Sequence, residues 1–367
     1  MKLDAAQKHI SLRQALSVVH KAAIAEGIPL SKRKALEAYV RSVPTDETGK
    51  LRLDQLVGVL NNLEQAIRFE DPEYLARNRG YKVKRIPDVQ EVVESKEFAN
   101  QKSTIWQSTL ENLWYIHHGT PAKLPSMIYR KQPENNEPPC IVCLSGAAGT
   151  GKSETTWLSA FYTLTLLFMM HDPHTELKHN PGRWIIFACQ GIQQKTTKDS
   201  LFDSLQYAID NSPWFEANCP RRKDFNEELQ WPKQRIKVIN LTGVFNAALG
   251  KDVLWAGITE INEMPVFEKS KRIANTSQTK LDVGESMWNT LENRIETRFS
   301  EAGGGFPGKL IADSARTHSG DFTSRLKLKA KNDSRIIIIE RKLWEAKAHN
   351  YPKNEPRFLV ELGDDMR

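Results

Sequence analysis

Eight consecutive residues, 146–153, have the composition of a loop that binds phosphate. They read GAAGTGKS and fit the pattern G-x-x-x-x-G-K-[ST]. Glycines in such a loop let backbone N–H groups curl around a phosphate with no Cβ in the way. The helix that follows adds free N–H groups and a partial positive charge at its start. The sequence therefore predicts a site for a nucleoside triphosphate with Mg²⁺.

The positions of this loop have different expected roles. Gly146 and Gly151 are the glycines that the pattern requires, and Lys152 would reach the β- and γ-phosphates. The Ser153 hydroxyl would hold Mg²⁺. The residues expected to bind the nucleotide are Gly146, Ala147, Ala148, Gly149, Thr150, Gly151, Lys152, Ser153 and Glu154. A chance glycine-rich turn is the alternative, and the apolar runs on both sides of the loop argue against it.

Hydrolysis also needs a carboxylate that polarises the attacking water and an acid that orders the Mg²⁺ shell. Two apolar runs end in acids: residues 253–260 read VLWAGITE, and residues 309–314 read KLIADS. We prefer the first run as the acidic strand, with Glu260 as the catalytic base. Ser314 at the end of the second run is then expected to be a polar sensor of the γ-phosphate.

One position departs from the usual acidic strand, because Thr259 stands where an Asp normally precedes the catalytic Glu. A hydroxyl can bond to a Mg²⁺-bound water but brings no charge. Either Asp313 or Glu263 compensates, or Mg²⁺ is held less firmly. Glu260 could also be a surface acid with no role. The expected metal ligands are Ser153, Thr259 and Glu260, with Thr155 and Thr156 as weaker candidates.

The elements that must position these residues alternate between strand and helix after residue 139. The expected strands are Cys140–Leu144, Trp184–Cys189, Ile236–Leu241, Val253–Ile258, Lys309–Ala312 and Ile336–Ile339. The expected helices are Glu154–Met170, Lys198–Asp210 and Met287–Phe299. Such alternation predicts an α/β fold of the P-loop NTPase type, with a mostly parallel sheet flanked by helices. Ligands of these sheets bind at the carboxyl ends of the strands, where the glycine-rich loop falls.

The chain before this region divides differently. We expect a small helical region over residues 1–70, with helices opening at Ser11, Ser31 and Asp54. They are either a DNA-reading helix-turn-helix or three packed helices with no such role. Residues 71–125 are expected to be a linker, polar and extended over 70–102, and a lead-in helix over 101–118. The ATPase domain is assigned to 126–345, and a tail or linker to 346–367.

Composition places few limits on function. The chain has 367 residues and a formal net charge of +7, which suits a phosphate-bearing partner without requiring one. No N-terminal signal peptide is visible, and the apolar run 157–170 is too short to span a membrane. Four cysteines do not form a disulfide framework; Cys140 and Cys143 are expected to point to opposite faces of a strand as free thiols.

Taken together, these motifs resemble the ATPase domain of large terminase subunits, the genome-packaging motors of tailed bacteriophages. The resemblance covers roughly residues 139–325. Residues 189–215 resemble the terminase segment in which a strand enters a helix ending in Ser-Pro. Residues 257–264 (GITEINEM) resemble the acidic strand, and Asp313-Ser314-Ala315-Arg316 resembles the coupling motif that relays the nucleotide state.

The resemblance implies an ATP-driven motor that moves double-stranded viral DNA into a procapsid in the host cytoplasm. It also implies a homo-oligomeric ring of about five subunits on a portal protein, a small terminase subunit as partner, and no membrane. An arginine from a neighbouring subunit would complete the site, with Arg294 and Arg298 as candidates, unless they form surface salt bridges. The adenine pocket would lie near Tyr129, Arg130 and Gln132.

Two further expectations concern DNA. Contacts should go mainly to phosphates, and the basic clusters to consider are residues 221–223 (RRK) and Lys327, Lys329 and Lys331. Full-length terminases carry a C-terminal nuclease, which is not expected here because the chain stops at Arg367. Glu361, Asp364 and Asp365 near the end read as a solvated acidic tail.

Other functions share the same phosphate-binding loop. A P-loop helicase or DNA-repair ATPase would usually carry motifs on a second domain, for which the chain has no space after residue 325. A slow nucleotide-dependent regulator gains some support from Thr259. A small-molecule kinase would usually show a short lid between strands, and no such segment is clear.

Overall fold

The computed structural model describes residues 9–11, 50–52, 82–83, 85–102, 105–118, 127–129, 139–225, 227–241, 245–268, 280–299, 308–315 and 320–346. By their contacts the residues fall into two compact units. One comprises residues 1–87 with 169–171, and the other comprises residues 88–168 with 172–367. Among the described residues, no helix combines the length and apolar character needed to cross a membrane.

Little of the first unit is described. Strands β1 (His9–Ser11) and β2 (Lys50–Arg52) pair antiparallel, with Ile10 opposite Leu51. The three helices expected in residues 1–70 lie outside the described residues. So do Arg130, Gln132, Arg316 and the C-terminal acids Glu361, Asp364 and Asp365.

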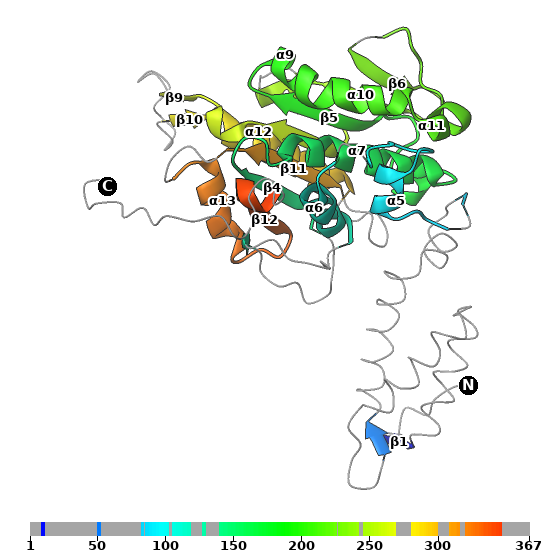
Figure 1. Cartoon of the computed structure of the whole chain (residues 1–367), viewed down its shortest axis with the longest axis horizontal. Helices are drawn as coiled ribbons and strands as arrows, with labels where there is room; N and C mark the ends of the chain where they lie inside the picture. The colour runs from blue at the N-terminus through cyan, green and yellow to red at the C-terminus, as the bar shows by residue number, and fades with distance from the viewer. Residues whose placement is uncertain are drawn as a thin grey trace. The chain divides into compact units, whose positions relative to one another are not determined.

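The second unit is built on an eight-stranded sheet with helices on both sides (Figure 1). Its strand order is β3-β12-β4-β11-β8-β5-β7-β6. The six inner strands are parallel; they are β4 (Ile141–Gly146), β5 (Ile185–Gly191), β7 (Ile236–Asn240), β8 (Val253–Thr259), β11 (Lys309–Ser314) and β12 (Ile336–Arg341). These are the six strands that the sequence predicts, which confirms the α/β, P-loop type of sheet.

The sequence does not predict the two outermost strands. β3 (Met127–Tyr129) pairs antiparallel with β12, and β6 (Glu228–Trp231) pairs antiparallel with β7. Both have only three or four residues, and β6 alternates between half-buried and buried positions. Short edge strands carry a weaker apolar signal than inner strands that are buried on both faces.

Helices fill the connections between the strands. They are α5 (Val89–Glu94), α6 (Gln107–His118), α7 (Lys152–Met169), α8 (Pro173–Glu176), α9 (Gln194–Thr197), α10 (Asp203–Asp210), α11 (Pro213–Asn218), α12 (Val283–Phe299), α13 (Phe322–Ala330) and α14 (Leu343–Ala346). A π-helical turn, Lys198–Phe202, joins α9 to α10. A separate antiparallel pair is formed by β9 (Val266–Glu268) and β10 (Lys280–Asp282).

Helix α5 corrects an expectation. The polar composition of residues 70–102 predicts an extended linker, yet Asp88 caps a helix by accepting a hydrogen bond from the N–H of Glu91 at 2.8 Å. Val89, Val92 and Val93 lie on its buried face. Three valines at this spacing were a helical signal hidden among charged neighbours.

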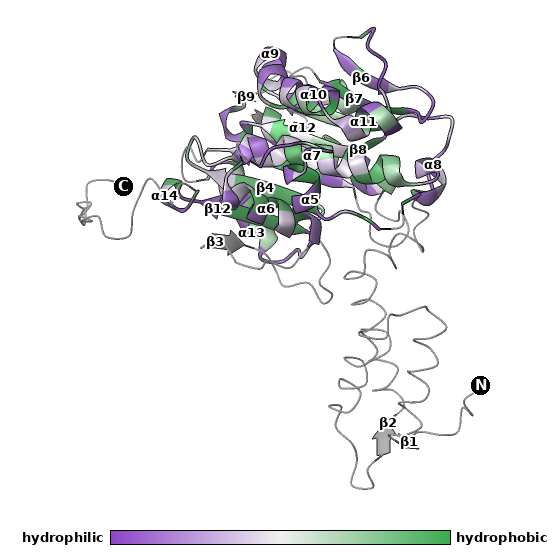
Figure 2. Cartoon of the chain, turned by 45° about the vertical axis from the view of Figure 1, so that its right-hand side comes forward, coloured by the Kyte–Doolittle hydropathy of each residue, from purple (hydrophilic) through white to green (hydrophobic). Residues whose placement is uncertain are grey.

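The two faces of the sheet are covered by different helices. On one face, α12 and α13 pack on Cys143 and Ala312 through side chains such as Trp288 and Leu326. On the other face lies α7, whose Phe161 and Phe168 contact aromatic rings of α11 and β6. Figure 2 shows the hydrophobic residues gathered in the sheet and in α7. All four cysteines are described, and none of them forms a disulfide bond.

Helix α6 packs beside the first part of α7. His117 and Ser159 are hydrogen-bonded between Nε2 and Oγ at 2.9 Å, and the His118 ring lies tilted against that of Trp114 with ring centroids 4.4 Å apart. The buried Lys309 ammonium donates to the carbonyls of Ile116 and Pro139 near the end of α6. Burial, with a smaller effect from Lys309, lowers the pKa of His117 well below its usual value, and burial lowers the pKa of His118 to about 4.

The low pKa of His118 predicts that the fold loses stability in acid. The unfolded chain takes up a proton near pH 6.5, whereas folded His118 takes it up only near pH 4. The free energy of unfolding should therefore fall as pH drops through this interval, by about 3 kcal/mol at most from this residue. His118→Phe keeps the ring contacts and should remove that part of the pH dependence in urea titrations.

His171→Phe, at an exposed position, is the matched control, and its free energy of unfolding should depend on pH as that of wild type does. An acid sensitivity in His118→Phe equal to that of wild type would contradict a depressed pKa at His118.

Candidate functional site

The glycine-rich loop connects β4 to α7 at the carboxyl edge of the sheet. Its glycines Gly146, Gly149 and Gly151 have φ values of 150°, 77° and 78°, a region that residues with a Cβ rarely adopt. A Cβ on Gly146 would also collide with the carbonyl oxygen of Arg341 on β12. The loop conformation therefore depends on glycine at the positions that the sequence pattern marks.

Lys152, the first residue of α7, folds back over the loop. Its Nζ donates to the carbonyl of Gly146 at 3.0 Å and to that of Ala147 at 2.9 Å. The Thr150 hydroxyl donates to Ala147 O at 2.9 Å, which closes the loop on itself. The side chain expected to bind phosphate thus lies against the loop, held by carbonyls that it can exchange for other acceptors.

Three residues with hydroxyl groups follow Lys152, and they differ in burial and in hydrogen bonding. Ser153 is half-buried in the first turn of α7, beside Glu154, whose pKa is raised by burial. Thr155 is fully buried and donates back to Gly151 O at 2.8 Å, an ordinary bond inside the helix. Thr156 is also fully buried, and its hydroxyl lies 3.1 Å from both Lys152 O and Asp313 Oδ2.

Asp313 is the buried acid of the site. It lies near the end of β11 and is fully buried; its Oδ2 contacts Thr156, while Oδ1 has no hydrogen-bond partner among the described residues. Burial and then the negative charge of Glu260 raise its pKa to about 7, while the Lys152 charge, the Thr156 hydroxyl and the backbone N–H of Glu260 oppose this rise. Lys152, Asp313 and Glu260 therefore form one electrostatic group.

Glu260 follows β8 directly and has an unusual backbone. Its φ of 52° and ψ of 45° are left-handed, which is uncommon for a residue other than glycine. A one-turn 3₁₀ helix, Ile261–Glu263, begins immediately after it. Backbone strain of this kind persists where the surroundings fix it, often at functional sites. The turn separates half-buried Glu260 from the fully buried strand before it.

Thr259, expected to be a metal ligand, lies on the same face of the sheet as Asp313. The two are partners in the β8–β11 ladder. The Thr259 hydroxyl, however, lies only 2.5 Å from where a Cβ on Gly191 of β5 would be. Thr197 also approaches Gly191 at that point. Because β5 and β11 flank β8 on opposite sides, the Thr259 hydroxyl leans away from β11 and the glycine-rich loop.

Ser314, expected to sense the γ-phosphate, lies on the other face of the sheet. It is fully buried, and its Oγ accepts a hydrogen bond from the backbone N–H of Asn262 at 3.1 Å. Successive residues of a strand point to opposite faces, and Asp313 takes the face of α7. The structure therefore places Asp313, rather than Ser314, beside the start of that helix.

Asn262 is a site residue to which sequence reasoning assigned no role. Its Nδ2 donates to Ala315 O at 2.7 Å and to Thr323 Oγ1 at 2.9 Å, and its Oδ1 accepts from Thr323 N at 3.1 Å. These bonds tie the turn after Glu260 to the end of β11 and to the start of α13. The available sequence signal was an asparagine two residues after the acid that follows the strand.

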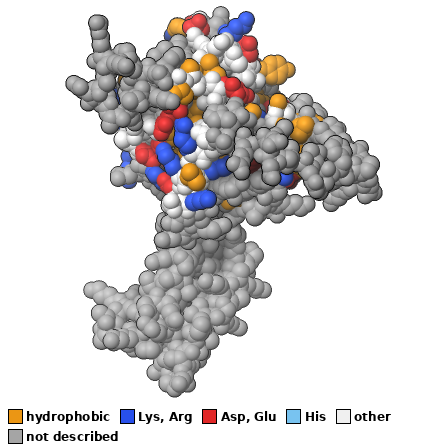
Figure 3. Space-filling view, turned by 90° about the vertical axis from the view of Figure 1, so that its left-hand side faces the viewer, with side chains coloured by type: hydrophobic (Ala, Val, Ile, Leu, Met, Phe, Trp, Pro, Cys, Tyr) orange, Lys and Arg blue, Asp and Glu red, His pale blue; other side chains and the backbone are white. Residues whose placement is uncertain are grey.

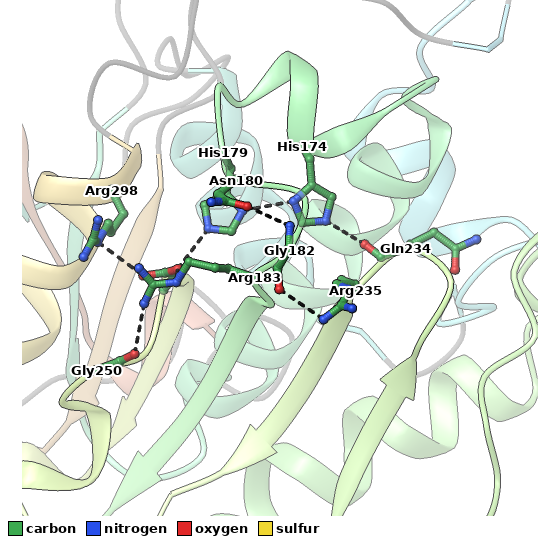
Figure 4. Close-up of polar contacts among 10 residues, drawn as sticks. His174, His179, Asn180, Gly182, Arg183, Gln234, Arg235, Gly250 and Arg298 are labelled. Carbon is green, nitrogen blue, oxygen red and sulfur yellow. Dashed lines mark hydrogen bonds and ion pairs between the residues drawn. The ribbon is translucent and has the colours of Figure 1, made fainter.

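Arg298 and Arg294 do not lie at this edge. Helix α12 begins near Ile261 and runs back along β8, so its last turn reaches the amino end of the sheet. There Arg298 pairs with the buried Asp252, which also holds Arg183 and His179 (Figure 4). Arg298 thus forms a salt bridge, which was the alternative to a role in the site of a neighbouring subunit. Breaking this bridge would leave the buried negative charge of Asp252 with less compensation. Arg294 is half-buried one turn earlier.

Much of the expected basic surface is neutralised. Arg221 holds Asp210 through two hydrogen bonds, Arg222 pairs with Asp224, and Lys327 pairs with Glu340. Figure 3 shows basic and acidic side chains interleaved on the face it presents. Lys329 is exposed on α13, and Lys331 is exposed in the turn that follows this helix.

The contact between Thr109 of α6 and Gly151 of the loop can be tested by substitution. Gly151→Ala would place a Cβ 2.5 Å from the Thr109 hydroxyl, in addition to the cost of its positive φ. We expect a loss of about 2–4 kcal/mol in the free energy of unfolding, measured with urea. Gly250→Ala is the matched control: its φ of 76° is nearly the same, but nothing lies within 4 Å, so about 1–2 kcal/mol is expected.

A second variant separates the contact from the backbone. The Thr109 hydroxyl is buried with no hydrogen-bond partner among the described residues, so Thr109→Ala alone should cost little. The double variant Gly151→Ala/Thr109→Ala should have a higher free energy of unfolding than Gly151→Ala alone. The gain should equal the amount by which Gly151→Ala costs more than Gly250→Ala. Strict additivity of the two changes would argue against this packing of α6 on the loop.

Comparisons with known proteins give a structural likeness without a sequence match. No protein-family model matches the chain, and no curated protein matches it. The chain is similar to the solved large terminase of a thermophilic bacteriophage, with a TM-score of 0.38 and 10% identity over 65% of this chain and 46% of that chain. The same terminase in complex with ADP gives a TM-score of 0.37 and 11% identity over 68% and 48%.

The large terminase of bacteriophage HK97 is also similar, with a TM-score of 0.35 and 13% identity over 69% of this chain and 46% of that chain. The chain therefore spans somewhat less than half the length of these solved proteins.

Proposed function

We propose that this chain is a P-loop ATPase. One observation carries the proposal: β11 lies between β4 and β8, and this order gathers Lys152, Asp313 and Glu260 into one electrostatic group at the carboxyl edge of the sheet. The Lys152 ammonium, which follows the phosphate-binding loop, then faces a carboxylate held at a neighbouring strand end. This is the arrangement that hydrolysis of a phosphoanhydride requires.

The chain's own groups have distinct roles in this reaction. The backbone N–H groups of residues 146–151 and the first turn of α7 receive the phosphates. Lys152 exchanges its bonds to Gly146 O and Ala147 O for phosphate oxygens, which are stronger acceptors because they are charged. Glu260, turned out of β8 by its left-handed backbone, accepts a proton from the attacking water.

Magnesium fits the oxygen groups present. Among the described residues no group of three or more His, Cys, Asp or Glu side chains could hold a metal alone. Mg²⁺ is commonly held by one or two protein oxygens together with water and substrate phosphates. The Ser153 hydroxyl would be one such oxygen, and the unpartnered Oδ1 of Asp313 is a buried oxygen that a cation would satisfy. The ion would neutralise charge on the phosphates.

We further propose that hydrolysis drives double-stranded DNA into a viral procapsid, as in the large terminases that the motifs resemble. The support is the order of four motifs along the chain: the loop at 146–153, the segment at 189–215, the acidic strand end at 257–264 and residues 313–316. Partners of this proposal are a ring of about five subunits, a portal and a small subunit. Arg294 is the candidate for action in a neighbouring subunit, because Arg298 pairs with Asp252.

A slow nucleotide-dependent regulator is the second candidate. The observation that favours it is Thr259, which leaves the acidic strand without the aspartate that usually precedes the catalytic glutamate. A helicase or repair ATPase would share the site and differ in its nucleic-acid partner. Turnover in the presence and absence of DNA separates these functions.

Lys152→Ala should abolish ATP hydrolysis, with a loss of at least about 100-fold, because the substitution removes the ammonium group that faces the phosphates. The measurement is steady-state phosphate release, alone and with linear duplex DNA. We expect wild-type turnover to rise with duplex. Lys233→Ala, at an exposed turn, is the control and should retain wild-type turnover.

Hydrolysis by Lys152→Ala at the wild-type rate would rule out the loop as the catalytic site. Wild-type turnover that ignores duplex would favour the regulator.

Glu260→Gln should keep ATP binding and lose hydrolysis by about 100-fold or more, because an amide cannot accept the proton of the attacking water. Equilibrium binding of a fluorescent ATP analogue and single-turnover hydrolysis measure the two effects separately. Glu216→Gln, exposed on α11, is the control. Loss of binding and hydrolysis together would assign Glu260 to nucleotide affinity instead of catalysis.

A further inference from the structure

We infer that Asp313, on β11, supplies the carboxylate that the acidic strand lacks at Thr259, so that the acid facing the metal and phosphates has moved one strand closer to the loop. The inference rests on the proposed ATPase function. In this arrangement Asp313 binds the cation, and Thr259 at the end of β8 contributes only to packing.

The register of the sheet makes this exchange between strands feasible. Asp313 is the partner of Thr259 on one side and of Leu144 on the other. Paired residues of neighbouring strands point to the same face, so Asp313 and Thr259 both face α7. Asp313 lies on the strand next to β4, however, whereas Thr259 lies one strand further away. The Thr156 hydroxyl, at 3.1 Å, fixes Asp313 under the first turns of α7.

The hydrogen bonding of Asp313 is incomplete. A fully buried carboxyl oxygen with no partner costs free energy, and such groups are rare in folded proteins. Asp313 Oδ1 is one; the charges of Lys152 and Glu260 act on the same carboxyl group, as does the backbone N–H of Glu260. A divalent cation would satisfy this oxygen and reduce the repulsion between the two carboxylates. The sequence alone could not show that the oxygen lacks a partner.

The competing residues are less well placed. The Thr259 hydroxyl leans toward Gly191 of β5, away from the loop. Glu263, the other acid considered, is exposed at the end of the 3₁₀ helix. Ser314 faces the opposite side of the sheet and already accepts from Asn262. Among the described acids at this edge, Asp313 is the one that is buried against the start of α7.

The test measures metal binding rather than turnover. Mn²⁺, as a probe for Mg²⁺, is titrated into the full chain with ADP and followed by electron paramagnetic resonance; ADP binding without metal is measured separately. Asp313→Asn should weaken Mn²⁺ binding about 10–100-fold and change metal-free ADP binding by less than about threefold. Thr259→Val should change Mn²⁺ affinity by less than about threefold.

Circular dichroism and the thermal midpoint verify that each variant is folded. If Asp313→Asn does not fold, Thr259→Val decides: a loss of about tenfold or more in its Mn²⁺ affinity overturns the inference, and affinity within about threefold supports it.

Two other results overturn the inference in distinguishable ways. If wild type binds Mn²⁺ with ADP and Asp313→Asn binds it equally well, Asp313 does not serve the cation, while the ATPase proposal stands. If wild type binds no nucleotide, the proposed function itself fails, and this inference fails with it.

Discussion

The parallel pairing of β4, β11 and β8 is the constraint on which the candidate site depends. Parallel strands bring their carboxyl ends to one edge, so the loop after β4, the acid of β11 and the turn after β8 must meet there. Residues 152, 260 and 313 are far apart in the chain, and only this ladder makes them neighbours. The buried helices on both faces hold the ladder, and thereby hold the site.

Burial of charge follows from this constraint. The end of β11 lies between two strands and beneath α7, so Asp313 loses its hydration and its pKa rises toward neutrality. Glu260 avoids the same burial because its left-handed backbone turns the chain out of the sheet directly after Thr259. Two acids one strand apart therefore have different environments, and such a difference allows paired carboxyl groups to take different roles.

The opposite edge of the sheet shows a second use of a buried acid. Asp252 just before β8 gathers Arg183, Arg298 and His179, which tie the loops before β5 and β8 to the end of α12. At the carboxyl edge, Asn262 plays a comparable part with neutral bonds, joining the turn after Glu260 to β11 and α13. Strand β8 is thus anchored at both ends, which favours a fixed position for the acid that follows it.

The sequence by itself determined the loop at 146–153, the six inner strands and the acid after β8, because each has a local signal: a glycine spacing, an apolar run, or a charge at the end of one. It could not determine the edge strands, which are short, or helix α5, whose three valines stand among charges. The tertiary structure alone decided that Asp313 faces α7 and Ser314 faces away, that Thr259 leans toward β5, and that Arg298 pairs with Asp252. The reason is physical: the face on which a strand residue lies, and the partner it meets, depend on register and strand order, which arise from contacts between segments more than fifty residues apart.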